Sequence, residues 1–203
     1  MKKLIYMFIV PAFLFSCGGS EATDTDDTDR DSTTTEIVEE VEEETNPKPL
    51  KSPRKQTSGL IEGIEVSVDY GSPSVRGREI WGDLVPFDKI WRAGANEATS
   101  ISFSEDVLVN ENAVSAGTYA LFMIPQEKGE WTIILNEEWS KEEHGVWGAY
   151  DHNPEKDVLR FDVSPITFIN TNVIEALEYE VQETGILFQW EMIALSIDVK
   201  KAN

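Results

Sequence analysis

Apolar and polar residues alternate with a period of two along most of the chain beyond residue 60. In the stretch IEVSVDY (64–70), four apolar or aromatic side chains alternate with three polar ones, and TSISF (99–103) repeats this pattern. TYALFMI (118–124) is instead apolar on both faces, as expected of a central strand. Because successive side chains of a strand point to opposite faces, this period predicts β-strands rather than helices.

Further strand patterns follow as far as the C-terminus, and most are separated by clusters of glycine, proline, asparagine and aspartate that are typical of turns. We therefore predict an all-β domain, an antiparallel β-sandwich of about nine or ten strands, with a β-barrel as the alternative. The later strand segments are WTIIL (131–135), VLRFDV (158–163), ITFI (166–169), LEYEV (177–181), ILFQWEM (186–192) and LSIDV (195–199).

Two stretches interrupt the strand pattern. Residues 71–91 contain three glycines and two prolines, which predict an ordered loop between strands. Residues 137–151 (EEWSKEEHGVWGAYD) are compatible with one helical turn or with a long loop. Binding residues concentrate on loops that a rigid sheet holds in place. We therefore expect any ligand-binding face to be built from the loop 71–97 and the segment 144–150, which include parts of these two stretches.

The first sixteen residues predict an export signal. Lys2 and Lys3 precede an apolar run from Leu4 to Phe15, which is too short for the helix of about 20 residues that spans a bilayer. The run ends in LFSC, which resembles a bacterial lipobox and implies cleavage before Cys17 and acylation of its thiol and new amino group. Cys17 is the only cysteine, and several acyl chains would anchor it stably in a lipid bilayer.

The segment that follows Cys17 predicts a disordered acidic linker. It is rich in Asp, Glu, Ser, Thr and Pro and has no aromatic residue as far as residue 59. So little apolar surface cannot offset the entropy that is lost on ordering. The predicted organisation is a signal peptide (1–16), the lipidated cysteine with its linker (17–59) and a β-sandwich domain (60–203).

The net charge of −21 narrows the range of partners. Residues 60–203 contain 26 acidic and 10 basic residues, so we expect no nucleic-acid partner, since phosphate neutralisation needs a basic surface. Gly18 carries no aspartate retention signal, which favours the outer membrane of a Gram-negative cell. The predicted partners are the lipid bilayer, through acylated Cys17, and an envelope glycan or protein.

The stretch VDYGSPSVRGREIWGDLVPFDKIWRAGANEATSISF (68–103), with AGTYALFMIP, WTIILN and WGAY further on, resembles a domain-of-unknown-function family of exported Bacteroidetes proteins. The resemblance covers nearly all of residues 60–203 and implies an exported β-rich domain, but it supplies no activity. The residues that fit the family pattern are Tyr70, Gly71, Pro73, Gly77, Arg78, Trp81, Gly82, Val85, Pro86, Trp91, Arg92, Gly94, Ala95, Asn96, Glu97 and Thr99, with Trp147 to Tyr150 later.

The candidate ligand-binding residues combine cations, aromatics and two polar groups. An arginine fork suits a carboxylate or phosphate and stacks on aromatic faces, while a tryptophan offers such a face or a platform for a sugar ring. The candidates are Arg78, Trp81, Trp91, Arg92, Asn96, Glu97 and Trp147.

The same residues have a structural interpretation. Glu97 or Asp83 would pair with Arg92 inside the protein, Asn96 would cap the loop backbone, and the tryptophans would belong to the core. For the motif WRAGANEAT (91–99) we expect such an internal latch between Arg92 and Glu97.

Metal binding and catalysis find little support. His144 and His152 are the only histidines, and their spacing matches no zinc pattern. The chain has no G-x-S-x-G, P-loop or dinucleotide motif, so we predict no cofactor and no enzyme activity.

The predicted function is a lipid-anchored, non-catalytic envelope domain that binds a ligand or partner. The alternatives are a structural envelope lipoprotein and a hydrolase that acts on glycans.

Replacing Cys17 by alanine tests the predicted anchor. We expect Cys17→Ala to move the protein from the membrane fraction to the soluble exported fraction, because the acylated thiol is lost. Immunoblotting of fractionated cells measures this shift. A variant that stays with the membranes would contradict the lipoprotein prediction.

Overall fold

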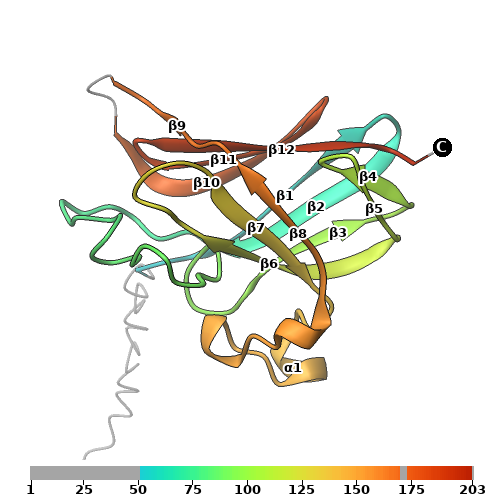
Figure 1. Ribbon diagram of the computed structural model, residues 1–203, viewed down its shortest axis with the longest axis horizontal. Helices are drawn as coiled ribbons and strands as arrows, with labels where there is room; N and C mark the ends of the chain where they lie inside the picture. The colour runs from blue at the N-terminus through green and yellow to red at the C-terminus, as the bar shows by residue number, and fades with distance from the viewer. Residues whose placement is uncertain (1–50, 170–172, 203) are drawn as a thin grey trace, which may run out of the picture. The chain divides into compact units, whose positions relative to one another are not determined.

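Strands dominate residues 51–169 and 173–202, the part of the chain that the computed structural model describes. Twelve strands in these ranges form two antiparallel sheets that pack face to face (Figure 1). The all-β sandwich predicted from the alternating pattern is therefore confirmed. All described residues belong to one compact unit, residues 46–203.

Each sheet is ordered by hairpins and longer connections. The first sheet has the order β1 (Arg54–Ile61), β2 (Ile64–Gly71), β3 (Thr99–Phe103), β6 (Gly117–Ile124), β7 (Trp131–Asn136) and β8 (Asp157–Val163). The second sheet has the order β10 (Ile174–Gln182), β11 (Gly185–Glu191), β12 (Ile193–Lys201), β4 (Val107–Val109) and β5 (Asn112–Val114), with β9 (Ile166–Thr167) paired to β12.

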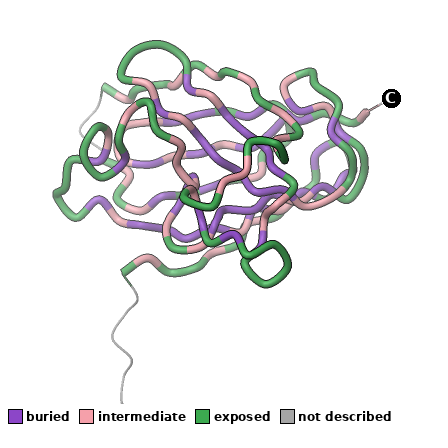
Figure 2. The backbone as a smooth tube through the Cα atoms, turned by 60° about the horizontal axis from the view of Figure 1, so that its bottom comes forward, coloured by how far each residue is buried: buried purple, intermediate pink, exposed green. Residues whose placement is uncertain are grey.

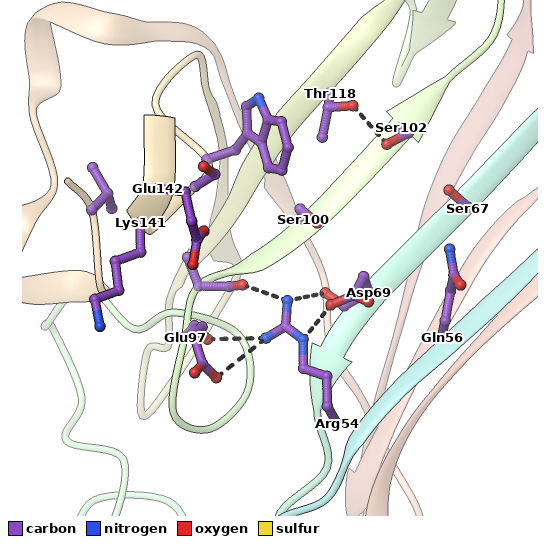
Figure 3. Close-up of a pocket in the computed structure, with 14 residues that line it drawn as sticks. Arg54, Gln56, Ser67, Asp69, Glu97, Ser100, Ser102, Thr118, Lys141 and Glu142 are labelled. Carbon is purple, nitrogen blue, oxygen red and sulfur yellow. Dashed lines mark hydrogen bonds and ion pairs between the residues drawn. The ribbon is translucent and has the colours of Figure 1, made fainter. Parts of the chain in front are cut away.

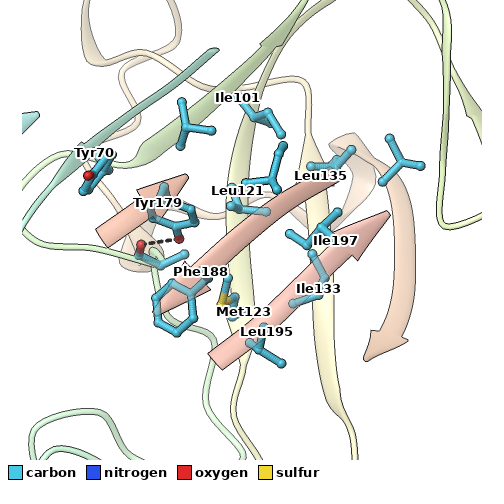
Figure 4. Close-up of a cluster of buried hydrophobic side chains, with 14 of the residues drawn as sticks. Tyr70, Ile101, Leu121, Met123, Ile133, Leu135, Tyr179, Phe188, Leu195 and Ile197 are labelled. Atoms are coloured by element: carbon cyan, nitrogen blue, oxygen red, sulfur yellow. Dashed lines mark hydrogen bonds between the residues drawn. The ribbon is translucent and has the colours of Figure 1, made fainter. Parts of the chain in front are cut away.

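The core lies between the two sheets and is built from the inward-facing half of each alternating strand. On β2, Ile64, Val66 and Val68 have no exposed surface. The second sheet contributes Phe188 and Leu195 to the same cluster (Figure 4). Figure 2 shows the resulting alternation of buried and more exposed residues along the strands. Removal of this apolar surface from water is the main force that holds the sheets together.

β6 is buried on both faces, as its apolar sequence predicts. Leu121 and Met123 belong to the main core, whereas Ala120 and Phe122 face outward. The outward pair packs in a second apolar cluster with Val146, which lies in the segment between β7 and β8. This segment carries a one-turn helix and two 3-10 turns: α1 (Lys141–His144), η1 (Ala149–Asp151) and η2 (Pro154–Lys156).

The other interrupting stretch, residues 71–91, is an ordered loop, as predicted. Isolated bridges pair Ser74 with Ala176 of β10 and Trp91 with Met123 of β6. The loop is therefore attached to one strand of each sheet. Among residues 51–169 and 173–202, no helix is long and apolar enough to cross a bilayer. The predicted signal peptide, Cys17 and the linker as far as residue 50 lie outside the described residues.

The structure corrects the predicted start of the domain. The boundary after residue 59 falls inside β1, so residues 54–59 are strand and not linker. The sequence RKQTSGLI resembles linker because the outward side chains of β1 face solvent and its inward Lys55, Thr57 and Gly59 are polar or small. Gly59 makes room for β10, since a Cβ at this position would lie 3.0 Å from Val181 Cγ1. β1 is held mainly by its antiparallel register of eight residue pairs with β2.

Two deletions in the Cys17→Ala background test where the domain begins. We expect removal of residues 22–50 to change the melting temperature by less than about 2 °C, because their composition adds no core. Removal of residues 22–59 also takes away most of β1, and a loss of several kcal/mol corresponds to roughly 10 °C or more. Calorimetry measures both values, and equal melting temperatures would show that β1 contributes nothing to the domain.

Candidate functional site

The motif WRAGANEAT (91–99) folds into a tight loop that is bonded to both sheets. The main chain of Trp91 forms two hydrogen bonds with Met123 of β6, with N–O distances of 2.7 and 2.9 Å. The buried carbonyl of Ala93 accepts hydrogen bonds from Thr99 Oγ1 at 3.1 Å and from Tyr179 Oη of β10 at 2.7 Å. Because these groups are buried, each lost bond would leave a polar atom without a partner. The loop is therefore held to β6 and β10 by buried hydrogen bonds.

Two glycines let this loop approach the end of β2. A Cβ on Gly71 would lie 1.9 Å from the carbonyl oxygen of Ala95, which is closer than any real contact. A Cβ on Gly94 would lie 2.6 Å from Thr99 Oγ1 and 3.1 Å from the Gly71 carbonyl oxygen. A larger residue at either position would force the loop away from the strand. The glycines of the sequence motif are therefore explained by packing.

Arg92 connects the loop to the segment between β7 and β8. Its Nη1 donates to the carbonyl of Asn96 in the same loop. Its guanidinium also lies against Gly148, where a Cβ would come within 3.0 Å of Arg92 Cζ. The Arg92 Cζ is 6.0 Å from the centroid of the Tyr150 ring, within the range of a cation–π contact. The motifs WRAGANEAT and WGAY, which are distant in sequence, thus interlock through one side chain.

The predicted latch between Arg92 and Glu97 is replaced by other contacts. Among the described residues Arg92 forms no ion pair, and the carboxylate of Glu97 lies 4.0 Å from Arg54 Nη1 at the start of β1. Asn96 was predicted to cap the backbone of its own loop. Its Nδ2 instead donates a hydrogen bond to the backbone carbonyl of Ser52, outside the loop, at 3.1 Å. The sequence pattern does not show that residues 52–54 belong to the domain. Arg92, five residues before Glu97, was therefore the nearest cation that it offered as a partner.

Trp81 and Trp91 are mainly core residues. Trp81 packs edge-on against Trp91, Trp131 and Trp190, with ring centroids 5.8, 4.7 and 5.6 Å away. Trp91 also stacks on Trp190 at 5.9 Å. Both side chains are half-buried, so part of each remains near the surface. Trp147 differs from them, since it is 40% exposed and lies outside this cluster.

Five of the seven ligand-binding candidates line one cavity of about 380 Å³: Arg78, Trp91, Arg92, Asn96 and Trp147. A neighbouring cavity of about 360 Å³ shares Trp91 and Arg92 with the first and adds Lys89 and Tyr150. We call the two cavities together the cationic site. The 71–97 loop and the 144–150 segment, predicted from sequence to build a common face, therefore meet here.

The cationic site is locally positive in an acidic domain. No aspartate or glutamate lines either cavity. Arg78 forms no ion pair with another described residue, and its guanidinium instead donates to the carbonyls of Val75 at 3.1 Å and Ser74 at 2.5 Å. Carbonyl oxygens fix the position of a guanidinium without neutralising its charge. Arg78 and Arg92 therefore keep a full positive charge and some of their five N–H donors.

The other two candidates lie elsewhere. Trp81 lines a separate cavity of about 440 Å³ together with Trp131, and Glu97 lines a cavity of about 550 Å³ on the outer face of the first sheet. Conversely, sequence reasoning missed Lys89 and Tyr150. Tyr150 belongs to the WGAY element and could have been selected on that ground, whereas Lys89 has no distinguishing sequence signal.

The two histidines do not share a site. His144 is the last residue of α1, and its Nδ1 accepts a hydrogen bond from the backbone N–H of Ser140. His152 Nε2 lies 2.7 Å from Asp157 Oδ1, and both side chains are more than nine-tenths buried. Burial raises the pKa of Asp157, but hydrogen bonds from Asn136, His152 and Arg160 outweigh this effect and lower it below its ordinary value. Among the described residues, no group of three His, Cys, Asp or Glu side chains could hold a metal ion.

Residues 52–199 match a family model described as "Protein of unknown function (DUF2911)". The match covers most of the chain. The chain belongs to this family. No curated protein and no solved structure matched the chain in the comparisons. The DUF2911 match begins at residue 52, just before β1. Like the structure, it therefore places the start of the domain before residue 60.

Denaturant unfolding tests which contacts hold the WRAGANEAT loop of this DUF2911 domain. Tyr179→Phe removes one of two donors to the buried Ala93 carbonyl and should cost about 1–3 kcal/mol. Glu97→Ala removes a partly exposed carboxylate from an ion pair and should cost less than about 1 kcal/mol. Urea titration followed by tryptophan fluorescence measures both. A larger loss for Glu97→Ala would contradict the role assigned to the Ala93 carbonyl.

Proposed function

We propose that the DUF2911 domain is a non-catalytic binding module whose cationic site takes a small anionic ligand. The observation that carries this proposal is the charge of the site. Arg78, Lys89 and Arg92 line it and no carboxylate does, in a chain of net charge −21. A bound carboxylate would supply the counter-charge that the described residues do not provide.

The walls of the cationic site favour a ligand that also has a planar or apolar part. Trp91 and Trp147 line the first cavity, and Tyr150, which is 92% exposed, lines the second. Large aromatic side chains at the surface beside a guanidinium suit a ring that carries an acidic group. A ring-bearing carboxylate is therefore the simplest ligand class that uses both the cations and the aromatic faces.

The charge of the remaining domain limits the size of the ligand. Acidic residues outnumber basic ones 26 to 10 in residues 60–203, which gives the domain a negative field. An extended polyanion such as a nucleic acid, or an anionic membrane surface, would be repelled by most of that surface. A small ligand needs to enter only the region where the local charge is positive.

We further propose that the domain acts at the cell envelope as an exported lipoprotein of the kind that the sequence resemblance implies. The LFSC element would place acyl chains on Cys17. A flexible linker of some thirty residues has an r.m.s. reach of roughly 30 Å, enough to hold the domain clear of a bilayer. Such a tether would leave the cationic site accessible to ligands in solution.

A structural role for the same residues is the second candidate, and one observation favours it. Arg92 holds the Asn96 carbonyl and packs against Gly148, as a residue that stabilises the fold would. Arg78 can distinguish a binding role from a structural one. Its side chain is exposed, and among the described residues it bonds only to carbonyls of its own loop. A purely structural site would not respond to an anion, whereas a binding site would.

Titration with benzoate, followed by NMR of the tryptophan indole N–H signals, tests the proposal. We expect benzoate to shift these signals and benzyl alcohol, its neutral counterpart, to shift them much less. Arg78→Gln should weaken benzoate binding about tenfold or more, because it removes a charged hydrogen-bond donor.

Lys128→Gln is the matched control. It removes the same charge from an exposed position outside the cationic site and should change the affinity by less than about twofold. Equal weakening by Arg78→Gln and Lys128→Gln would show that benzoate responds only to net charge. Equal binding of benzoate and benzyl alcohol would likewise refute an anion site.

A further inference from the structure

The cavity of about 550 Å³ on the outer face of the first sheet shares no lining residue with the cationic site. The segment between β7 and β8 packs on the outward side chains of β6 and β7 through the second apolar cluster. Outward side chains of β1, β2 and β3 and Thr118 of β6 line the cavity, together with Ser140, Lys141 and Glu142 at the start of α1. We call this hollow beside the covering segment the sheet-face cavity.

Small polar side chains form the floor of the sheet-face cavity. Neighbouring strands lie about 4.8 Å apart, so three residues in register across adjacent strands span roughly 10 Å. Serine and threonine keep the floor low, whereas the larger β-branched and aromatic residues usual in strands would fill it. The strand register gives two such rows: Gln56, Asp69 and Ser100 in the first, and Ser67, Ser102 and Thr118 in the second.

Much of the hydrogen-bonding capacity of this floor is unused. Ser100 is only 8% exposed, yet its hydroxyl forms no hydrogen bond with another described residue. The side chains of Gln56 and Ser67 form none either, while Ser102 and Thr118 bond each other at 2.8 Å. Fully buried side-chain polar atoms without a partner are, among the described residues, the indole nitrogens of Trp81 and Trp190, so the Ser100 hydroxyl keeps some contact with solvent and can bond water or a ligand. Water can satisfy the floor groups in the free protein, and a ligand that displaces this water must offer the same donors and acceptors.

Arg54 fixes two carboxylates at one end of the cavity. It donates to the carboxylate of Asp69 and lies 4.0 Å from that of Glu97. It also donates to the main-chain carbonyls of Glu97 at 3.5 Å and Ala98 at 3.1 Å, so its position is set by the backbone (Figure 3). Each carboxylate keeps free lone pairs that can accept hydrogen bonds from a ligand.

We propose that the sheet-face cavity binds a neutral saccharide. Sugar hydroxyls donate and accept in pairs, which matches the carboxylates of Asp69 and Glu97 together with the serine hydroxyls of the same lining. Trp139, which is half-buried, stands in the wall of the same cavity and offers an apolar face for the C–H side of a sugar ring. Hydroxyl, carboxylate and indole groups thus occur together within one hollow.

Other ligand classes fit this cavity less well. A small anion would meet three carboxylates, Asp69, Glu97 and Glu142, while Arg54 is already engaged by two of them. The other cation of the lining, Lys141, has its Nζ 4.3 Å from the centroid of the Trp147 ring. An apolar ligand would cover the floor hydroxyls without giving them partners. A neutral molecule with many hydroxyl groups avoids both penalties.

Saturation-transfer NMR of the full-length protein with glucose, galactose, mannose, N-acetylglucosamine, cellobiose and N,N′-diacetylchitobiose tests the inference. We expect at least one of these sugars to bind. The double variant Ser67→Ala/Ser100→Ala should weaken its binding about tenfold, because two hydrogen bonds to the sugar are lost. Its thermal unfolding should be unchanged, since neither hydroxyl bonds another described residue.

Ser58→Ala is the matched control, because Ser58 lies on the outward face of β1 but does not line the cavity, and it should bind the sugar like the native protein. Absence of saturation transfer to every sugar of the panel would overturn the inference. A double variant that binds as tightly as the native protein would overturn it as well. Arg78→Gln should leave sugar binding intact. The proposals for the sheet-face cavity and for the cationic site are therefore tested independently.

Discussion

The buried carbonyl of Ala93 is the point on which the candidate sites depend. It accepts hydrogen bonds from Thr99 in its own loop and from Tyr179 in the opposite sheet, and it has no exposure to water that could replace them. Burial raises the pKa of Tyr179 well above its ordinary value of 10.0, so its hydroxyl remains a donor at any physiological pH. With this carbonyl held, the backbone on either side of it has little freedom, and Trp91 and Arg92 are positioned by the fold.

Arg92 combines a structural role with the recognition role that we propose for it. Its contacts with the Asn96 carbonyl and with Gly148 hold two sequence motifs together, which is a structural task. These contacts use neutral partners, however, and leave the charge uncompensated. A carboxylate in their place would have made a stronger latch and removed the positive potential. The proposal of an anion site therefore rests more on the absence of a carboxylate from the lining of the cationic site than on the presence of an arginine.

The alternating pattern predicted the strands from Ile64 onward except the two three-residue strands β4 and β5, and it predicted both interrupting stretches, because burial of one strand face leaves a direct record in the sequence. β1 left no such record, since it is paired along its whole length with β2 and its inward residues before Ile61 are polar or small. Because β1 was not predicted, Arg54 at its start was not considered as a partner of Glu97, although its Nη1 lies 4.0 Å from that carboxylate. Which carboxylate meets which arginine depends on strand register, and spacing along the chain does not contain that information.

The WRAGANEAT loop is the partition between two cavities of opposite chemistry. Asn96 lines the cationic site, whereas the next residue, Glu97, lines the sheet-face cavity. An arginine holds the loop backbone from each side, Arg92 at the Asn96 carbonyl and Arg54 at the carbonyls of Glu97 and Ala98. A change inside the loop would therefore disturb both cavities at once. Only residues away from it, such as Arg78 on one side and Ser100 on the other, can alter one chemistry while leaving the other intact.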